Sequence, residues 1–244
     1  MHAVLESLEK MEHEYRRQII HAAFGLLIFA FPFFSTLTLL VLSLLLMIAL
    51  GHFREYPPIE KYLYKKPLPG SREMLTDGVN DGIRSAQNLA MSLFILLLIS
   101  LLLEFTSLSF PLYVIGGAMA ISTFGSSAAT FVRHRKELQL KADTGASGTG
   151  TESYLLPSSI VMLGVGIITA YIAGIWIAGW EDIGISRNLI FFVAVIGSIT
   201  GALFESIPSR VDDNVSVPLG SGMAMWMFHS FGFSVPPSQM FIAL

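Results

Sequence analysis

Long apolar stretches recur along this chain, and they restrict the folds that it can adopt. A helix needs roughly 20 apolar residues to cross a bilayer, and several stretches here approach or exceed that length. Hydrophobic residues make up 53% of the 244 residues and charged residues only 14%, with a mean hydropathy of +0.64. These values lie well outside the range of soluble globular domains. We therefore predict an all-α integral membrane protein.

The longest apolar stretch, residues 19–50, is about twice as long as one membrane span needs to be. Pro32, Ser35 and Thr36 interrupt it near the middle, which predicts two short spans joined by a tight turn. The other predicted spans are 87–103, 111–132, 153–180, 188–204 and a weaker one that starts near 217. The sequence thus predicts a single polytopic domain, 1–244, with about seven transmembrane helices and six as the lower count.

Positive charge is distributed unevenly between the two predicted sides of the membrane. With seven spans, the N-terminal tail and the predicted loops 51–86, 131–152 and 205–216 share one side. That side carries 14 of the 15 Lys and Arg residues, and Arg187 lies on the other. The positive-inside rule therefore predicts that the N-terminus and these three loops are cytoplasmic, where nucleotides are available.

Composition excludes several other classes of function. The chain has no cysteine, which excludes disulfides, thiolate metal sites and cysteine nucleophiles. Its formal net charge of −3 does not indicate a nucleic-acid partner. The polar motifs that remain are therefore the best guide to function.

A polar run, residues 205–218, separates two strongly apolar stretches. Glu205 directly follows one predicted span, and Asp212, Asp213 and Asn214 directly precede another. Carboxylate and amide oxygens are hard ligands that suit Mg²⁺ and, through it, the phosphates of a nucleotide. Adjacent carboxylates repel each other, so a cation is a natural reason to keep two together. A helix cap is the alternative for one of these residues, but the whole run predicts a membrane enzyme that handles phosphate.

A second polar group lies at the start of the first apolar stretch. Arg17, His21 and Gly25 are four residues apart, so a helix places them on one face, close to Arg16. An ionisable histidine about one turn inside a span is costly and often functional. We predict that the arginines contact phosphate and that His21 orients a group or carries a proton. The alternative is that the arginines are membrane anchors and His21 reaches back to the interface.

The Gly/Ser/Thr-rich segment 144–151 is predicted to be a flexible cytoplasmic loop. Its backbone N–H groups, including that of Gly148, could wrap a phosphate, with Lys141 as a nearby phosphate contact. The segment lacks the lysine of a P-loop and the third glycine of a dinucleotide fingerprint. A plain linker is therefore the alternative.

Two signatures at opposite ends of the chain together resemble one family. The spacing of Glu205, Pro208, the triplet 212–214 and Pro218 is similar to the C-terminal signature of the CTP-dependent polyprenol and lipid kinases. That group includes dolichol kinase, phytol kinase and the CTP-dependent diacylglycerol kinase. Residues 14–25 resemble its N-terminal signature, and chain length and span number also agree. The resemblance implies phosphoryl transfer from CTP to a polyprenol, isoprenoid alcohol or diacylglycerol-type lipid, with Mg²⁺ as cofactor.

The middle of the chain departs from the family pattern. The family carries Gly-Asp followed by small residues, whereas this chain has Gly125 followed by Ser126 and Ser127. Residues 141–149 are at best an eroded counterpart of the family's Lys-Ser-x-Glu-Gly-Ser-like loop. The missing aspartate leaves a catalytically degenerate membrane scaffold as one alternative. A CDP-lipid-forming cytidylyltransferase is the other, because it would use the same lipid, metal and CTP but release pyrophosphate.

The residues and the resemblance together assign three sets of predicted roles. The predicted catalytic residues are Asp212, Asp213, Glu205 and His21. The predicted nucleotide or phosphate contacts are Arg16, Arg17, Lys141, Asn214 and Gly148. The predicted metal ligands are Asp212, Asp213 and Asn214.

Overall fold

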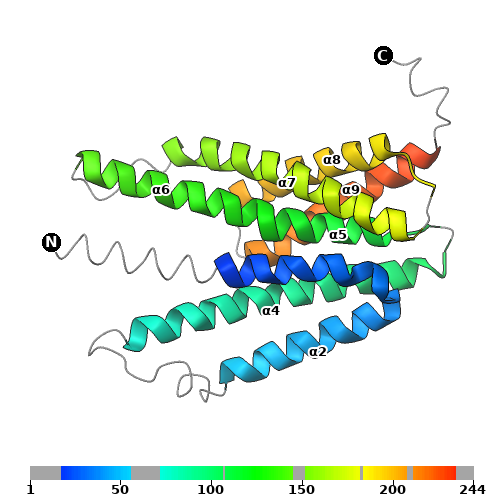
Figure 1. Cartoon of the computed structure of the whole chain (residues 1–244), viewed down its shortest axis with the longest axis horizontal. Helices are drawn as coiled ribbons and strands as arrows, with labels where there is room; N and C mark the ends of the chain where they lie inside the picture. Colours follow the sequence, from blue (N-terminus) through cyan, green and yellow to red (C-terminus); the bar gives the residue numbers. More distant parts are fainter. Residues whose placement is uncertain are drawn as a thin grey trace, which may run out of the picture.

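The computed structural model describes residues 18–55, 72–106, 108–144, 152–181, 184–207 and 211–234 (Figure 1). The first helix is Gln18–Phe33, whose last part, Leu27–Phe33 (η1), is a 3₁₀ helix. The further elements are α2 (Thr36–Glu55), α4 (Arg72–Leu103), α5 (Leu112–Ala120), the π-helical turn η2 (Ile121–Gly125), α6 (Ser126–Thr144), α7 (Glu152–Trp180), α8 (Arg187–Ser206) and α9 (Asp213–Ser234). The described residues contain no strand, which confirms the predicted all-α class.

Five helices in the described part of the chain are long and apolar enough to cross a membrane. They are Thr36–Phe53, Asp81–Leu103, Leu112–Lys136, Pro157–Trp180 and Arg187–Ser206. Each overlaps a span predicted from the sequence. The first helix is apolar but shorter, and α9 is not among the five. The chain is therefore a multi-pass membrane protein.

The predicted break inside the first apolar stretch is confirmed. Pro32 lies within the last turns of the first helix, and Phe34 is extended. Ser35 then starts α2, because its Oγ accepts a hydrogen bond from the backbone N–H of Thr38 at 3.2 Å. The chain thus reverses within two residues, between Phe33 and Thr36.

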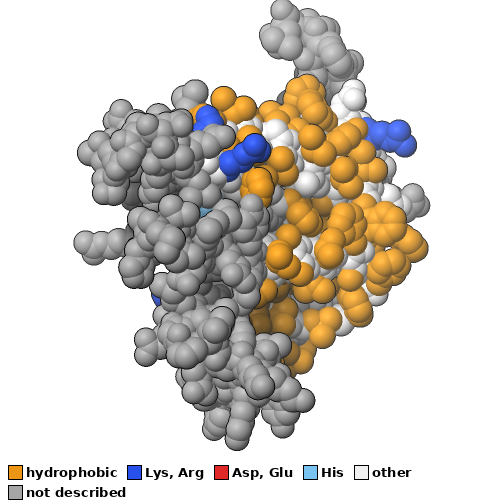
Figure 2. All heavy atoms as spheres, turned by 60° about the vertical axis from the view of Figure 1, so that its left-hand side comes forward, with side chains coloured by type: hydrophobic (Ala, Val, Ile, Leu, Met, Phe, Trp, Pro, Cys, Tyr) orange, Lys and Arg blue, Asp and Glu red, His pale blue; other side chains and the backbone are white. Residues whose placement is uncertain are grey.

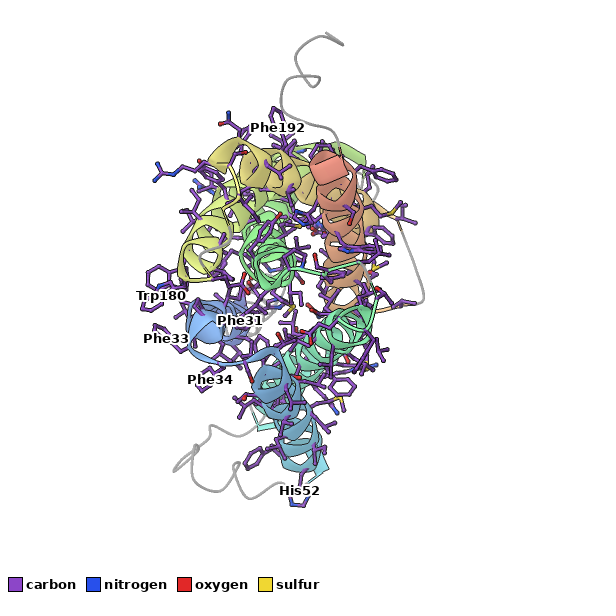
Figure 3. The ribbon with its side chains drawn as sticks, turned by 90° about the vertical axis from the view of Figure 1, so that its right-hand side faces the viewer. Phe31, Phe33, Phe34, His52, Trp180 and Phe192 are labelled. Atoms are coloured by element: carbon purple, nitrogen blue, oxygen red, sulfur yellow. The ribbon has the colours of Figure 1, made fainter. Side chains whose placement is uncertain are left out.

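The longest continuous helical stretch, formed by α5, η2 and α6, runs through the middle of the bundle (Figure 3). Every residue of α5 is buried, and this helix packs against α4, α7, α8, α9 and η1. Small residues allow this close packing: a methyl group at Gly117 would lie 2.6 Å from the Met225 side chain. At Gly125 the neighbour is the Met162 carbonyl, which a methyl group would approach to 3.3 Å. The small-residue stretch near 125–130 therefore serves helix packing, at least at its first residue.

Most of the helices begin or end at one of two ends of the bundle (Figure 1). At the end that we name the charged end, the first helix begins, α2 ends, α4 begins, α6 ends and α7 begins. At the opposite end lie the described residues between the helices, 33–36, 103–106, 108–112, 180–181 and 184–187. Aromatic rings gather there, and Figure 3 shows Phe33 and Trp180 side by side, with ring centroids 5.1 Å apart. Such rings are typical of a membrane interface.

The lateral surface of the bundle is apolar. Figure 2 shows hydrophobic side chains over most of the described face, with Lys and Arg near its edges. The helix α2 packs chiefly on α4 and exposes Leu37, Val41, Leu45 and Ile48. An apolar surface of this extent is what contact with lipid requires.

Candidate functional site

The junction between α8 and α9 holds the predicted acidic residues. Asp212 immediately precedes α9 and caps it. Its Oδ1 accepts a hydrogen bond from the Asn214 backbone N–H at 2.9 Å and another from Asn214 Nδ2 at 2.7 Å. A carboxylate at this position satisfies a backbone donor and interacts favourably with the helix dipole. The helix-cap alternative thus describes Asp212, whose Oδ1 is already engaged.

Glu205 lies in the last turn of α8, with its side chain 6% exposed. Its Oε1 accepts a hydrogen bond from Arg133 Nη2 of α6 at 3.0 Å, and the Arg133 side chain is 39% exposed. Glu205 Oε2 and Arg133 Nε are buried and have no hydrogen-bond partner among the described residues. Removing a carboxylate from water is costly, so it needs a compensating charge. Arg133 supplies that charge through Glu205 Oε1, but Glu205 Oε2 still lacks a hydrogen-bond partner among the described residues.

Asp213 brings a second carboxylate to the same place. It is exposed in the first turn of α9 and lies within electrostatic range of Glu205. With Arg133 included, two negative charges face one positive charge, so the group attracts a further cation. Asp213 is exposed and carries a carboxylate that can accept a proton, while Arg133 offers donors to an anion.

A buried serine fixes the start of α9 against α4. Ser92 Oγ lies 2.8 Å from the Asn214 carbonyl and 2.9 Å from the Asn88 carbonyl, and its O–H is shared between them. Because Ser92 is fully buried, water does not compete for this donor. The position of the first turn of α9 is therefore set by α4 as well as by α8.

His21 is 3% exposed and joins three helical segments. Its Nε2 lies 3.2 Å from the Ser122 carbonyl in η2, and its Nδ1 lies 3.1 Å from Ser85 Oγ in α4. A carbonyl only accepts, so Nε2 carries the hydrogen and Nδ1 accepts from the Ser85 hydroxyl in neutral His21. This arrangement gives His21 a clear structural role. Its catalytic role stays a prediction.

The structure brings together only part of the predicted site. Asp213 lies within electrostatic range of Glu205, and Asp212 and Asn214 lie in the same cap. Lys141 lies two turns further along α6 than Arg133, and its side chain lies outside the described residues. Arg16, Arg17 and Gly148 also lie outside the described residues.

The predicted Mg²⁺ site is compatible with the donors present. No group of three or more His, Cys, Asp or Glu side chains in the described part of the chain could hold a metal ion alone. Mg²⁺ at nucleotide sites, however, usually takes one or two carboxylates and completes its shell with phosphate and water oxygens. Asp213 and the buried Glu205 Oε2 are hard oxygen donors of that kind. The residues therefore fit an ion that arrives with phosphate.

Sequence reasoning missed Arg133 as a member of this site. In the sequence it is one of the basic residues after a predicted span, and its position is explained by the positive-inside rule alone. A signal was nevertheless present, since Gly125, Ala129 and Arg133 are four apart and share one helix face. Gly125 and Ala129 are both buried, so Arg133 continues a face that points into the bundle.

Comparisons with known proteins do not assign this chain to a family. The chain matches no protein-family model, and no curated protein or solved structure matches it.

Proposed function

We propose that this chain is a membrane lipid kinase, which transfers a phosphoryl group from a nucleotide to the hydroxyl of a lipid alcohol. The observation that carries this proposal is the grouping of Glu205, Asp213 and Arg133 at one end of an apolar bundle. Phosphoryl transfer requires mainly positioning and charge compensation from the protein. This group offers both signs of charge beside the bilayer, and the resemblance to CTP-dependent kinases supports the same function.

Seven crossings with a cytoplasmic N-terminus are the topology that we propose with this function. Five helices are long and apolar enough to cross individually, and the first helix and α9 complete the count. The location of 14 of the 15 Lys and Arg residues on one predicted side supports a cytoplasmic charged end. A soluble nucleotide would then reach Arg133 and Asp213 directly.

In the proposed reaction, a lipid alcohol moves from the bilayer to the interface beside α8 and α9. Its hydroxyl oxygen forms a bond to the γ-phosphorus, and its proton passes to the Asp213 carboxylate. The bond between the γ-phosphorus and the β–γ bridging oxygen breaks, and the nucleoside diphosphate leaves with that electron pair. Asp213 is preferred to Asp212 as proton acceptor because it lies within electrostatic range of Glu205, and because Asp212 Oδ1 accepts two hydrogen bonds in the cap of α9. Mg²⁺, when bound, supplies charge neutralisation on the phosphates.

A dual-label assay tests the proposal. Purified full-length protein with Mg²⁺ receives CTP labelled at either the γ-phosphate or the cytosine, together with lipid alcohols, diacylglycerol or phosphatidic acid. We expect only the γ-phosphate label to enter an alcohol or diacylglycerol. A parallel reaction with γ-labelled ATP identifies the preferred donor, for which CTP is implied by the resemblance.

The same assay separates the alternatives. Entry of the cytosine label into phosphatidic acid would identify a cytidylyltransferase and contradict the kinase. Failure of both labels to enter any lipid would contradict both enzymes and favour a membrane scaffold, in which Glu205 and Arg133 merely join α8 to α6.

A further inference from the structure

We infer that Arg133 is a phosphate-binding residue, and that its contact with Glu205 is exchanged for the phosphate when the ligand arrives. The inference deepens the proposed function and rests on it only for the source of the phosphate. Its basis is an ion pair that is incomplete on both partners and unevenly buried.

The Arg133–Glu205 pair uses one hydrogen bond where two are possible. Arginine and carboxylate groups frequently form two parallel bonds. Here the 3.0 Å contact joins only Nη2 and Oε1, while Arg133 Nε and Glu205 Oε2 are buried without a partner among the described residues. Buried polar atoms that remain unused cost free energy. The geometry is therefore poor for a purely structural clamp and leaves donors available to a ligand.

Burial differs sharply between the two partners. The Glu205 side chain is 6% exposed, whereas the Arg133 side chain is 39% exposed. Of the two partners, the Arg133 side chain is therefore the one that a ligand from outside the bundle can reach more easily. Arginine has five N–H donors, of which this contact uses one, so Arg133 can bind a ligand before it releases the carboxylate.

The surrounding charges select the kind of anion. Asp213 and Glu205 repel any anion, so a bound anion must offer the guanidinium stronger acceptors than the single Glu205 contact does. The planar guanidinium matches phosphate oxygens in geometry. Lys136 follows Arg133 by three residues on the same face of α6 and adds a positive charge to this end of the helix. A phosphate group with two or more negative charges meets these conditions, whether from a nucleotide or from a phosphorylated lipid headgroup.

Competition between Glu205 and phosphate predicts the sign of a mutational effect. Glu205→Gln removes a negative charge next to Arg133 but leaves the guanidinium in place. Phosphate should then bind more tightly, by about three- to tenfold at moderate salt. A purely structural pair predicts a less stable protein with unchanged or weaker phosphate binding. The two interpretations therefore differ in direction.

The test measures binding of inorganic tripolyphosphate to the purified full chain in detergent by isothermal titration calorimetry. Arg133→Gln should weaken binding by about tenfold or more, because a charge-assisted hydrogen bond is lost. Arg133→Lys should restore part of the affinity, since it keeps the charge but not the planar fork. Arg135→Gln, two residues along the same helix and exposed, is the matched control and should change binding little.

The double variant R133Q/E205Q separates binding from folding. It removes both charges of the pair, so it should recover stability lost in R133Q while still failing to bind tripolyphosphate. A parallel titration with short-chain phosphatidic acid identifies the phosphate source, and preferential binding of either ligand supports the site. No binding by the wild-type chain, weaker binding by E205Q, or equal losses in R133Q and R135Q would overturn the inference. Because no transfer is measured, these results are independent of whether the lipid-kinase proposal holds.

Discussion

The Arg133–Glu205 ion pair at the charged end differs from the buried polar contacts at the opposite end. At the opposite end, Tyr113 Oη and His229 Nδ1 lie 2.7 Å apart, and Ser100 Oγ donates to the Phe110 carbonyl at 2.7 Å. At the charged end, Glu205 and Arg133 share one contact, and each keeps a buried atom without a partner among the described residues. We call the contacts at the opposite end closed, because the polar atoms named there are paired. We call the Arg133–Glu205 contact open, because it leaves two buried polar atoms without a partner among the described residues.

This difference distinguishes contacts that fasten helices from contacts that can receive a ligand. A closed polar contact inside an apolar bundle avoids the cost of an unsatisfied group and so holds its helices together. The indole N–H groups on the surface at the opposite end are also paired, since Trp176 donates to the Phe29 carbonyl and Trp226 to the Ser109 carbonyl. An open contact reduces stability, and such local compromises are expected at functional sites.

The largest expected effect is on activity at the charged end. Asp213→Asn should lower the initial rate of phosphoryl transfer at least about a hundredfold, because a positioned proton acceptor contributes that much or more. Glu104→Gln changes an exposed carboxylate at the opposite end and should leave the rate within about twofold of wild type. Incorporation of the γ-phosphate label into lipid measures both. Equal losses in the two variants would remove the functional distinction between the ends.

Breaking the open pair should have the largest effect on stability. Arg133→Gln leaves the Glu205 carboxylate without its compensating charge. The expected loss is about 2 kcal/mol, below the usual figure for a fully buried pair because Arg133 is partly exposed. Unfolding by SDS titration in mixed micelles measures it. If R133Q/E205Q proved less stable than R133Q, the charge of Glu205 would not be the cause.

A change at the closed end should affect stability but not binding. Tyr113→Phe removes the hydroxyl next to His229 Nδ1 and should cost about 1–2 kcal/mol, the usual effect of losing a buried hydrogen bond. The same SDS titration measures this loss, while tripolyphosphate affinity should stay at the wild-type value. A change in that affinity would show that the two ends are coupled and not independent.

The smallest expected effect concerns the cap of α9. Asp212→Ala should cost about 1 kcal/mol, because the Asn214 N–H loses its acceptor, whereas Asp212→Asn should cost less since Asn also caps helices. Comparison of the two unfolding midpoints tests this. If D212N proved as damaging as D212A and also abolished transfer, Asp212 would have a role beyond capping.

Helix positions followed from the sequence because the length of each apolar run determines whether it can span a membrane. The reversal at 33–36 was also predictable, since Pro32 and Ser35 are respectively a helix breaker and a helix cap. The extent of α6 was not predictable in the same way. The predicted loop 131–152 is helical as far as Thr144, because Arg, Lys, Glu and Leu are good helix formers that continue a span after its apolar part ends.

The site was only partly predictable, for a different reason. Asp212, Asp213 and Asn214 are adjacent in sequence, so their grouping required no knowledge of packing. Glu205 and Arg133 are 72 residues apart, and their contact depends on how α6 and α8 pack together. The same holds for His21 and Ser85, which are 64 residues apart. Contacts of this kind depend on how the helices pack, which the spacing of residues along the chain does not reveal.

The π-helical turn Ile121–Gly125 has a consequence for which direction Arg133 faces. A π turn contains one more residue than the α-helical turn that it replaces, so it changes the angular phase of everything that follows by about 100°. Deleting one residue within this turn should therefore rotate α6 as a unit and move the guanidinium away from α8. Since the chain has no cysteine, a disulfide between Cys substitutions at Arg133 and Glu205 would report this rotation without background. The five residues of η2 thus determine which face of α6 is turned toward the neighbouring helices.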